Sequence, residues 1–95
     1  MILTASEIKK LLKKWRFYKA YTSSSDGTEL TKKLNAIESY VTRLDEIDGA
    51  IMRMKYYDCL DAEIIAAHVY LTRRGVYYRI ENIIKDMVYT LANGG

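Results

Sequence analysis

The stretch DAEIIAAHVYLTRRGVYYRI, residues 61–80, decides the fold that this sequence predicts. It opens with Asp61, a residue type that often caps helices, and Leu60 before it can pack on Ile65 as a staple. Leu71 fills a tight turn, and Thr72 is a second helix cap. The apolar positions of the first helix are Ile64, Ile65, Ala66 and Val69, and those of the second are Val76, Ile80, Ile83, Met87 and Leu91. This spacing predicts two helices joined by a short turn.

The first turns of the second helix are both basic and aromatic. With Val76 facing inward, the arginines and tyrosines face outward, where a guanidinium can bond to guanine in the major groove or neutralise phosphates. The N-terminus of a helix favours phosphate as well. The residues expected to contact DNA are Thr72, Arg73, Arg74, Tyr77, Tyr78 and Arg79, with Lys55 and Lys85 as further phosphate contacts. The pattern favours a helix-turn-helix that reads duplex DNA.

Composition restricts the class of protein. The chain has 95 residues, 49% of them hydrophobic, with five glycines and no proline, which favours one small all-α fold. One cysteine and one histidine cannot form an internal disulfide or a metal quartet, so we expect no cofactor, no metal site and a reducing setting. No phosphate-binding glycine loop or paired-carboxylate motif is present, and we expect no enzymatic activity. No apolar run reaches the ~18 residues of a membrane span, and no signal peptide is expected.

The N-terminal segment predicts an amphipathic helix over about residues 5–21. Thr4 and Glu7 have the spacing of a capping box, and Trp15 belongs to an apolar stripe that repeats at helical spacing. We interpret this stripe as core, although a basic amphipathic helix can also lie on a membrane. Six cations against Glu7 alone leave two interpretations open, a nucleic-acid contact or a solvated face. The polar segment at residues 21–28 predicts a loop.

A second helix is expected from about residue 28, and its apolar residues follow a heptad spacing. They are Leu30, Leu34, Ile37, Val41 and Leu44. This heptad seam can pack on the first helix as an antiparallel hairpin, which we favour, or pair with a second copy. A third helix follows from about residue 46 to Tyr57, with Ile47, Ile51 and Met54 on its apolar face. The predicted fold is all-α with four to five helices, an N-terminal helical hairpin at 1–45 followed by a helix-turn-helix region at 46–95.

Residues 54–66, MKYYDCLDAEIIA, and 71–80, LTRRGVYYRI, resemble region four of bacterial sigma factors. They are still more similar to the small phage regulators of late genes of the RinA and ArpU types, and the resemblance covers about the last forty residues. Tyr70 and Cys59 stand where that family usually has turn glycines, and Ile64 stands where it usually has glutamate. A tyrosine at positive φ costs about 1–2 kcal/mol, so we expect a turn of a different shape.

The resemblance implies a phage-encoded or prophage-encoded transcription regulator that works with host RNA polymerase in the cytoplasm of a bacterial cell. A homodimer is expected, because one short helix reads few base pairs. The candidate dimer surfaces are the heptad seam and the outer face of the last helix, with Tyr78, Asn82, Lys85 and Tyr89. Two alternatives stay open: a protein-interaction module, such as an inhibitor or adaptor of a host protein, and a small DNA-packaging subunit.

Three single residues carry narrower expectations. Cys59 is expected to be buried, and His68 is expected at the surface near the turn. Gly75 lies inside a predicted helix, where glycine costs about 1 kcal/mol relative to alanine. It either permits a close approach to DNA or to the preceding helix, or is a tolerated weak position.

Overall fold

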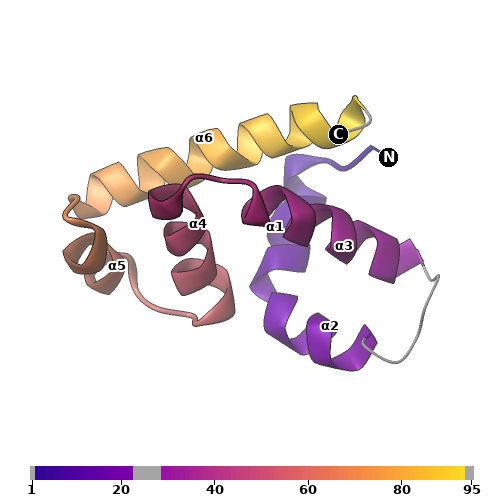
Figure 1. The fold of residues 1–95 in the computed structure, drawn as a ribbon, viewed down its shortest axis with the longest axis horizontal. Helices are drawn as coiled ribbons and strands as arrows, with labels where there is room; N and C mark the ends of the chain where they lie inside the picture. The colour runs from indigo at the N-terminus through magenta and orange to yellow at the C-terminus, as the bar shows by residue number, and fades with distance from the viewer. Residues whose placement is uncertain (1, 23–28, 94–95) are drawn as a thin grey trace.

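The computed structural model describes residues 2–22 and 29–93 (Figure 1). Those residues form six α-helices and one π-helical segment, with no strand among them, and the predicted all-α fold is confirmed. The elements are α1 (Ala5–Lys13), α2 (Trp15–Thr22), α3 (Glu29–Thr42), α4 (Glu46–Met52), η1 (Arg53–Tyr57), α5 (Ala62–Val69) and α6 (Arg73–Ala92). Helices α1 to α3 lie toward one end, α4, η1 and α5 lie toward the other, and α6 extends across both (Figure 1).

The single helix predicted over residues 5–21 is wrong, because the chain breaks it at Lys14. The capping box before it is confirmed, since the Glu7 amide donates to Thr4 Oγ1 over 3.1 Å. At Lys14 the backbone leaves the helical region, with φ −115° and ψ 20°. As a result α1 packs on α6 and α2 packs on α3, two surfaces that one straight helix would not reach. The predicted loop falls mostly at residues 23–28, which lie outside the described residues.

Helix α3 forms an antiparallel hairpin with α2, as the heptad spacing predicted (Figure 1). Its seam residues Leu34, Ile37 and Val41 are only 5%, 1% and 1% exposed. They are covered because α3 also packs against α4 and α6. The middle of the seam is therefore filled by the chain itself, whereas Leu30 and Leu44 at its two ends are partly buried.

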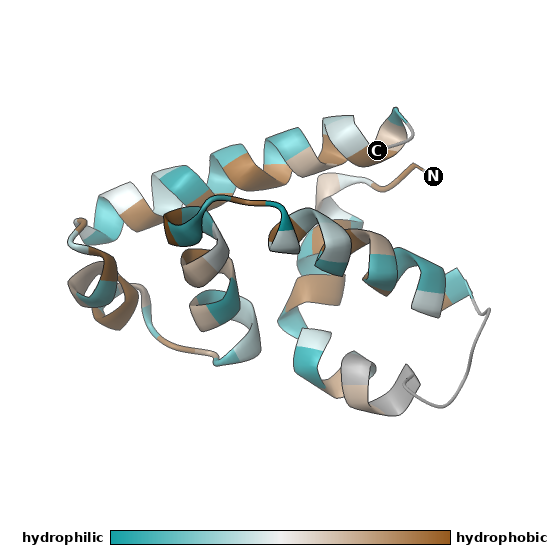
Figure 2. Ribbon diagram, viewed as in Figure 1, coloured by the Kyte–Doolittle hydropathy of each residue, from teal (hydrophilic) through white to brown (hydrophobic). Residues whose placement is uncertain are grey.

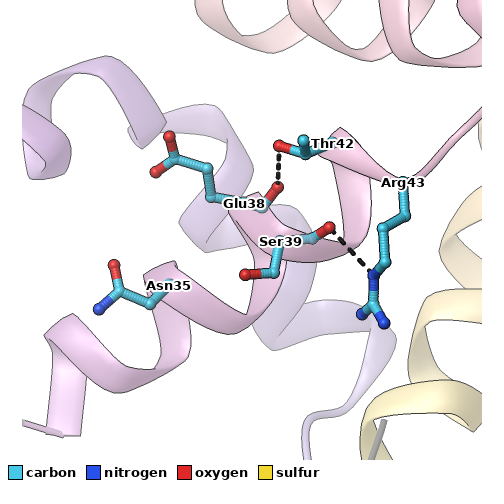
Figure 3. Close-up of a pocket in the computed structure, with 5 residues that line it drawn as sticks. All are labelled: Asn35, Glu38, Ser39, Thr42 and Arg43. Carbon is cyan, nitrogen blue, oxygen red and sulfur yellow. Dashed lines mark hydrogen bonds between the residues drawn. The ribbon is translucent and has the colours of Figure 1, made fainter.

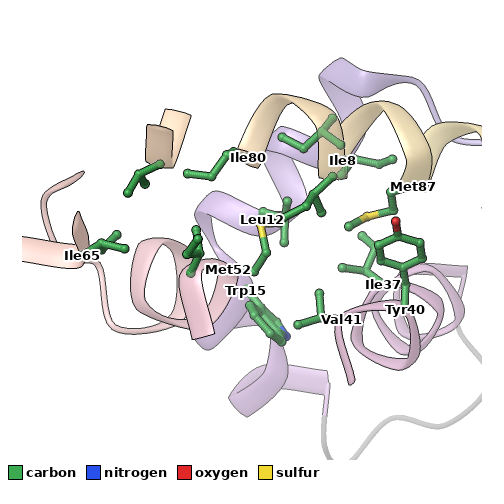
Figure 4. Packing of buried hydrophobic residues seen from close by; sticks show 14 of the residues in the cluster. Ile8, Leu12, Trp15, Ile37, Tyr40, Val41, Met52, Ile65, Ile80 and Met87 are labelled. Atoms are coloured by element: carbon green, nitrogen blue, oxygen red, sulfur yellow. The ribbon is translucent and has the colours of Figure 1, made fainter. Parts of the chain in front are cut away.

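One apolar core connects all parts of the described chain. Side chains from α1, α3 and α6, including Leu12, Ile37 and Met87, converge at its centre (Figure 4). Along α6 polar and apolar segments alternate, and the apolar ones turn toward the helices below it (Figure 2). The core is continuous across residue 45, where the sequence suggested a boundary. Ile47 was expected in this core but is 43% exposed, because the core covers that face of α4 only from Ile51 onward.

Two turns place residues other than glycine in the left-handed region: Cys59 has φ 58° and Tyr70 has φ 57°. Each turn closes the helix before it. The Leu71 amide donates to the Ala66 carbonyl over 3.0 Å, the bond that usually accompanies a left-handed glycine. At η1 the Leu60 amide bonds one residue further back, to the Met54 carbonyl over 2.8 Å, because a π-helical turn is wider. The expectation of a different turn shape at Tyr70 is therefore wrong.

In the loop between η1 and α5, and in α5 itself, one prediction is wrong and others are confirmed. Cys59 is exposed rather than buried, because the left-handed turn carries it out past the end of η1. His68 is exposed, as predicted. Asp61 holds the N-cap position of α5, although its side chain makes no capping hydrogen bond. Leu60 packs partly buried against the core.

Candidate nucleic-acid interface

Helix α6 begins where the sequence predicted, because Thr72 caps it. Thr72 Oγ1 accepts a hydrogen bond from the Gly75 amide over 2.9 Å. A Cβ atom on Gly75 would lie 3.2 Å from Thr72 Oγ1 and 3.7 Å from Leu71 Cβ. Glycine therefore leaves room for the cap, and the close approach at this position is to the turn before α6.

Three residues predicted to contact DNA come together around the Tyr77 ring. Lys55 Nζ and the Arg73 guanidinium carbon each lie 5.8 Å from the ring centroid. Lys55 comes from η1, whereas the other two belong to the first turns of α6. A cation over an exposed aromatic ring gains about 0.5–1 kcal/mol. The fold thus holds two positive charges beside the start of α6, as a phosphate contact requires.

Acidic side chains lie next to this cluster. Glu63 Oε1 is 3.8 Å from Arg73 Nη1, and the two side chains are 77% and 63% exposed. An ion pair this exposed contributes about 0–1 kcal/mol, so Arg73 can exchange the carboxylate for a phosphate at small cost. The three residues of the cluster line a hollow of about 250 Å³ together with Asp61, Ala62 and Glu63.

Arg74 and Tyr78 lie one turn apart on the outer face of α6. Arg74 is exposed and makes no ion pair with any residue in 2–22 or 29–93. Tyr78 is 69% exposed and Tyr89 is 70% exposed. Asn82 and Lys85 are exposed between them. The outer face of α6 is therefore open along its length, as the sequence predicted.

Arg79 takes part in holding α6 to the rest of the fold. Its Nη1 atom donates to Asp48 Oδ1 of α4 over 2.9 Å, and its side chain is only 38% exposed. Beside this pair, the Tyr40 hydroxyl of α3 donates to Asp86 of α6. Burial, followed by the hydrogen bond to Asp86, raises the pKa of Tyr40. The charge of Arg79 is already paired, unlike that of Arg74.

Two exposed apolar side chains near α6 were not predicted as part of a site. Ile64 was expected on the buried side of α5 but is 45% exposed, while Ile65 and Ala66 fill the core instead. The resemblance contained a signal for this, because glutamate is usual at that position. Tyr70, in the turn directly before α6, is 94% exposed.

A wider recess lies on α3. It measures about 830 Å³ and is lined by Asn35, Glu38, Ser39, Thr42 and Arg43 (Figure 3). Thr42 Oγ1 donates to the Glu38 carbonyl over 2.8 Å, and Arg43 Nε donates to the Ser39 carbonyl over 3.3 Å. The Thr42 and Arg43 side chains thus bond to backbone carbonyls of α3 and do not converge on a ligand position.

The described residues contain neither a metal-binding group nor a membrane-spanning helix. Over 2–22 and 29–93, no group of His, Cys, Asp and Glu is arranged to hold a metal ion. No helix in the same ranges combines the length and apolar character needed to cross a membrane. Comparison with protein-family models, curated proteins and solved structures finds no match for this chain.

Proposed function

We propose that this protein binds duplex DNA with a sequence preference and that the first two turns of α6 enter the major groove. The observation that carries the proposal is the meeting of Lys55 and Arg73 on Tyr77, beside the exposed Arg74. A helix that follows a short closed turn and carries its cations at its N-terminal end suits the docking of a helix-turn-helix.

The residues of this interface have different roles. Arg74 reads bases, because it is exposed and its guanidinium can bond to guanine O6 and N7 together. Lys55 and Arg73 neutralise phosphates at the edge of the groove, and Arg73 leaves Glu63 to do so. The amides of the first turn of α6 add a favourable field for phosphate, although Thr72 already binds one of them.

The biological setting is proposed from the resemblance to phage regulators. The protein is a phage or prophage transcription regulator that works with host RNA polymerase in the bacterial cytoplasm. It acts as a homodimer, because two copies read twice the number of base pairs. With the middle of the heptad seam filled, the second copy is assigned to the later outer face of α6, at Asn82, Lys85 and Tyr89.

Selection of bound duplexes from a random pool, followed by titration of the recovered duplex, tests the proposal. We expect Arg74→Ala to weaken binding about 5- to 150-fold, which corresponds to the 1–3 kcal/mol of one bidentate base contact. The helical circular dichroism signal is expected to stay unchanged, because Arg74 is exposed and unpaired in the described fold.

Arg43→Ala is the matched control. Arg43 is an exposed arginine directly after α3, its Nε bonds to the Ser39 carbonyl of that helix, and it contributes to no part of the interface. The proposal is overturned if no duplex binds at low salt, or if the Arg74 and Arg43 variants weaken binding equally.

One observation favours the protein-interaction module instead. Tyr70 is 94% exposed and Ile64 is 45% exposed on the same helix-turn segment, and aromatic side chains are enriched in protein interfaces. This alternative predicts that the random pool yields no enriched duplex even at low salt.

A further inference from the structure

A second basic surface lies at the junction of α1 and α2. Lys13, Lys14 and Arg16 line a hollow of about 330 Å³ together with Phe17, Tyr56 and Cys59. Four other hollows on the described surface each include an aspartate or a glutamate, and this one includes neither. Cationic side chains without an adjacent carboxylate suit a phosphate group.

The helix break at Lys14 gathers these cations. On a straight helix, Lys14 and Arg16 would point about 160° apart, because successive residues turn by about 100°. With φ −115° and ψ 20° at Lys14, both side chains instead line the same hollow. Elsewhere on α1, Lys9 is already paired with Glu81 of α6, with 3.5 Å between Nζ and Oε1.

The junction is fixed to η1 rather than attached as a loose arm. Trp15, between the two cations in sequence, is 4% exposed and meets the Tyr57 ring edge-on, with 5.5 Å between centroids. Both α1 and α2 pack against η1. The hollow therefore keeps its position relative to α6, on which α1 also packs.

The basic hollow adjoins the proposed DNA interface through η1 and the loop after it. Lys55 belongs to the cluster at α6, and the next residue, Tyr56, lines the basic hollow. Likewise Cys59 lines the basic hollow, and Asp61, two residues later, lines the hollow beside Tyr77. In helix-turn-helix complexes the helix before the reading helix crosses the DNA backbone, and here the loop at Cys59 leads into that helix, α5.

We propose that the hollow of Lys13, Lys14 and Arg16 clamps a backbone phosphate of the duplex whose major groove α6 reads. The inference rests on the proposed function and extends its footprint from α6 to the N-terminal helices. Phe17, which is 64% exposed beside the cations, packs against the adjoining deoxyribose. The clamp adds affinity without base selection, because a phosphate carries no sequence information.

The test compares two double variants on the duplex recovered from the random pool. Lys14→Gln with Arg16→Gln removes two cations of the hollow. Lys32→Gln with Arg43→Gln removes two exposed cations, one in α3 and one directly after it, and neither residue lines either hollow. Binding is measured by anisotropy between about 50 and 200 mM salt, the range over which phosphate contacts weaken most visibly. Circular dichroism checks that both variants fold.

We expect the first double variant to lower the slope of log affinity against log salt by about 1, the value for one phosphate contact, and to keep the same selected sequence. The second is expected to leave the slope within error of the wild type. The clamp is overturned, and the α6 interface survives, if neither pair changes the slope while Arg74→Ala still weakens binding. The clamp is also overturned if both double variants lower the slope equally, because that result would show a general effect of net charge. If the wild type binds no duplex, the proposed function and the clamp fail together.

Discussion

Cys59 and Tyr70 keep left-handed backbone conformations without being glycine. Such a conformation costs a residue with a Cβ atom about 1–2 kcal/mol. At Tyr70 the side chain recovers none of this by packing, because it is 94% exposed. Strained residues cluster at binding sites, so the position of Tyr70 directly before the proposed reading helix is consistent with an external contact.

Tyr70→Gly is expected to raise the free energy of unfolding by about 1 kcal/mol, because it relieves the left-handed strain at a site that packs against nothing. The gain is reduced by the larger conformational entropy of glycine in the unfolded chain. Urea unfolding measures it. Tyr78→Gly is the control, since Tyr78 is also largely exposed but lies inside α6, where replacing tyrosine with glycine should lower stability by about 0.5 kcal/mol. A loss of stability in both variants would contradict the strain at Tyr70.

At the level of single residues, the sequence showed which positions were unusual, but it predicted the burial of those residues less well. Tyr70 stood out because the resembled family usually has glycine there. The turn nevertheless has the left-handed shape of a glycine turn, with the tyrosine backbone strained. Ile64 and Cys59 were placed in the core wrongly. Helical spacing shows which residues share a face, whereas burial depends on which neighbouring elements cover that face, and those neighbours come from distant parts of the chain.

Helix α6 packs into the core through one face, and we propose that it reads DNA with the other. Inward, Val76, Ile80 and Met87 enter the core, and the ion pair from Arg79 to Asp48 joins the helix to α4. Outward, Arg74 and Tyr78 are exposed. Arg79 is therefore paired within the fold and Arg74 is not, although the sequence pattern placed both in the DNA contact.

Arg79→Ala is expected to lower the free energy of unfolding by about 1 kcal/mol, because it leaves the partly buried Asp48 without its cation. Arg74→Ala is expected to leave that free energy unchanged and to lose duplex affinity. Thermal unfolding and duplex titration of both variants separate the two roles. Equal destabilisation by the two substitutions would contradict this division.

At the level of elements, the sequence predicted α3, α5 and α6, but it joined α1 with α2 and did not distinguish the π-helical η1 from α4. The apolar spacing from Ile8 through Trp15 to Tyr18 stays helical across Lys14, and neither glycine nor proline marks a break there. The break arises from tertiary packing, since α1 is drawn to α6 and α2 to α3. Local propensity contains no information about that competition.

Across the whole molecule, residues far apart in sequence build the proposed DNA surface. The motif at 71–80 was enough to predict Arg73, Arg74 and Tyr77, because they follow one another on one helix. The placement of Lys55 on the Tyr77 ring required the fold. The hollow at Lys14 and Arg16 required it even more, because it exists only where the first helix breaks.

The hydrogen bond from Tyr40 of α3 to Asp86 of α6 is expected to make the free energy of unfolding depend on pH in the alkaline range. The raised pKa of Tyr40 means that the folded protein holds its hydroxyl proton at a pH where the unfolded chain, with a pKa near 10, has released it. Stability from this contact is therefore complete below about pH 10 and is lost as pH rises further.

Tyr40→Phe is expected to flatten the fall in unfolding free energy between about pH 10 and 12, as measured by urea titration at each pH. Some dependence should remain, because burial also raises the pKa of Tyr56. Tyr78→Phe, at an exposed position, serves as the control and should keep the wild-type profile. An unchanged profile in the Tyr40 variant would show that its hydroxyl does not control alkaline stability.

Trp15 is the single tryptophan of the sequence, and the structure places it at the joint between the basic hollow and η1. Its indole N–H is buried and has no hydrogen-bond partner among the described residues. An indole in such apolar surroundings emits at shorter wavelengths than one in water. The protein therefore contains its own optical reporter, which shifts to the red on unfolding and needs no attached dye. Its place beside Lys14 and Arg16 makes it a natural probe of the proposed clamp.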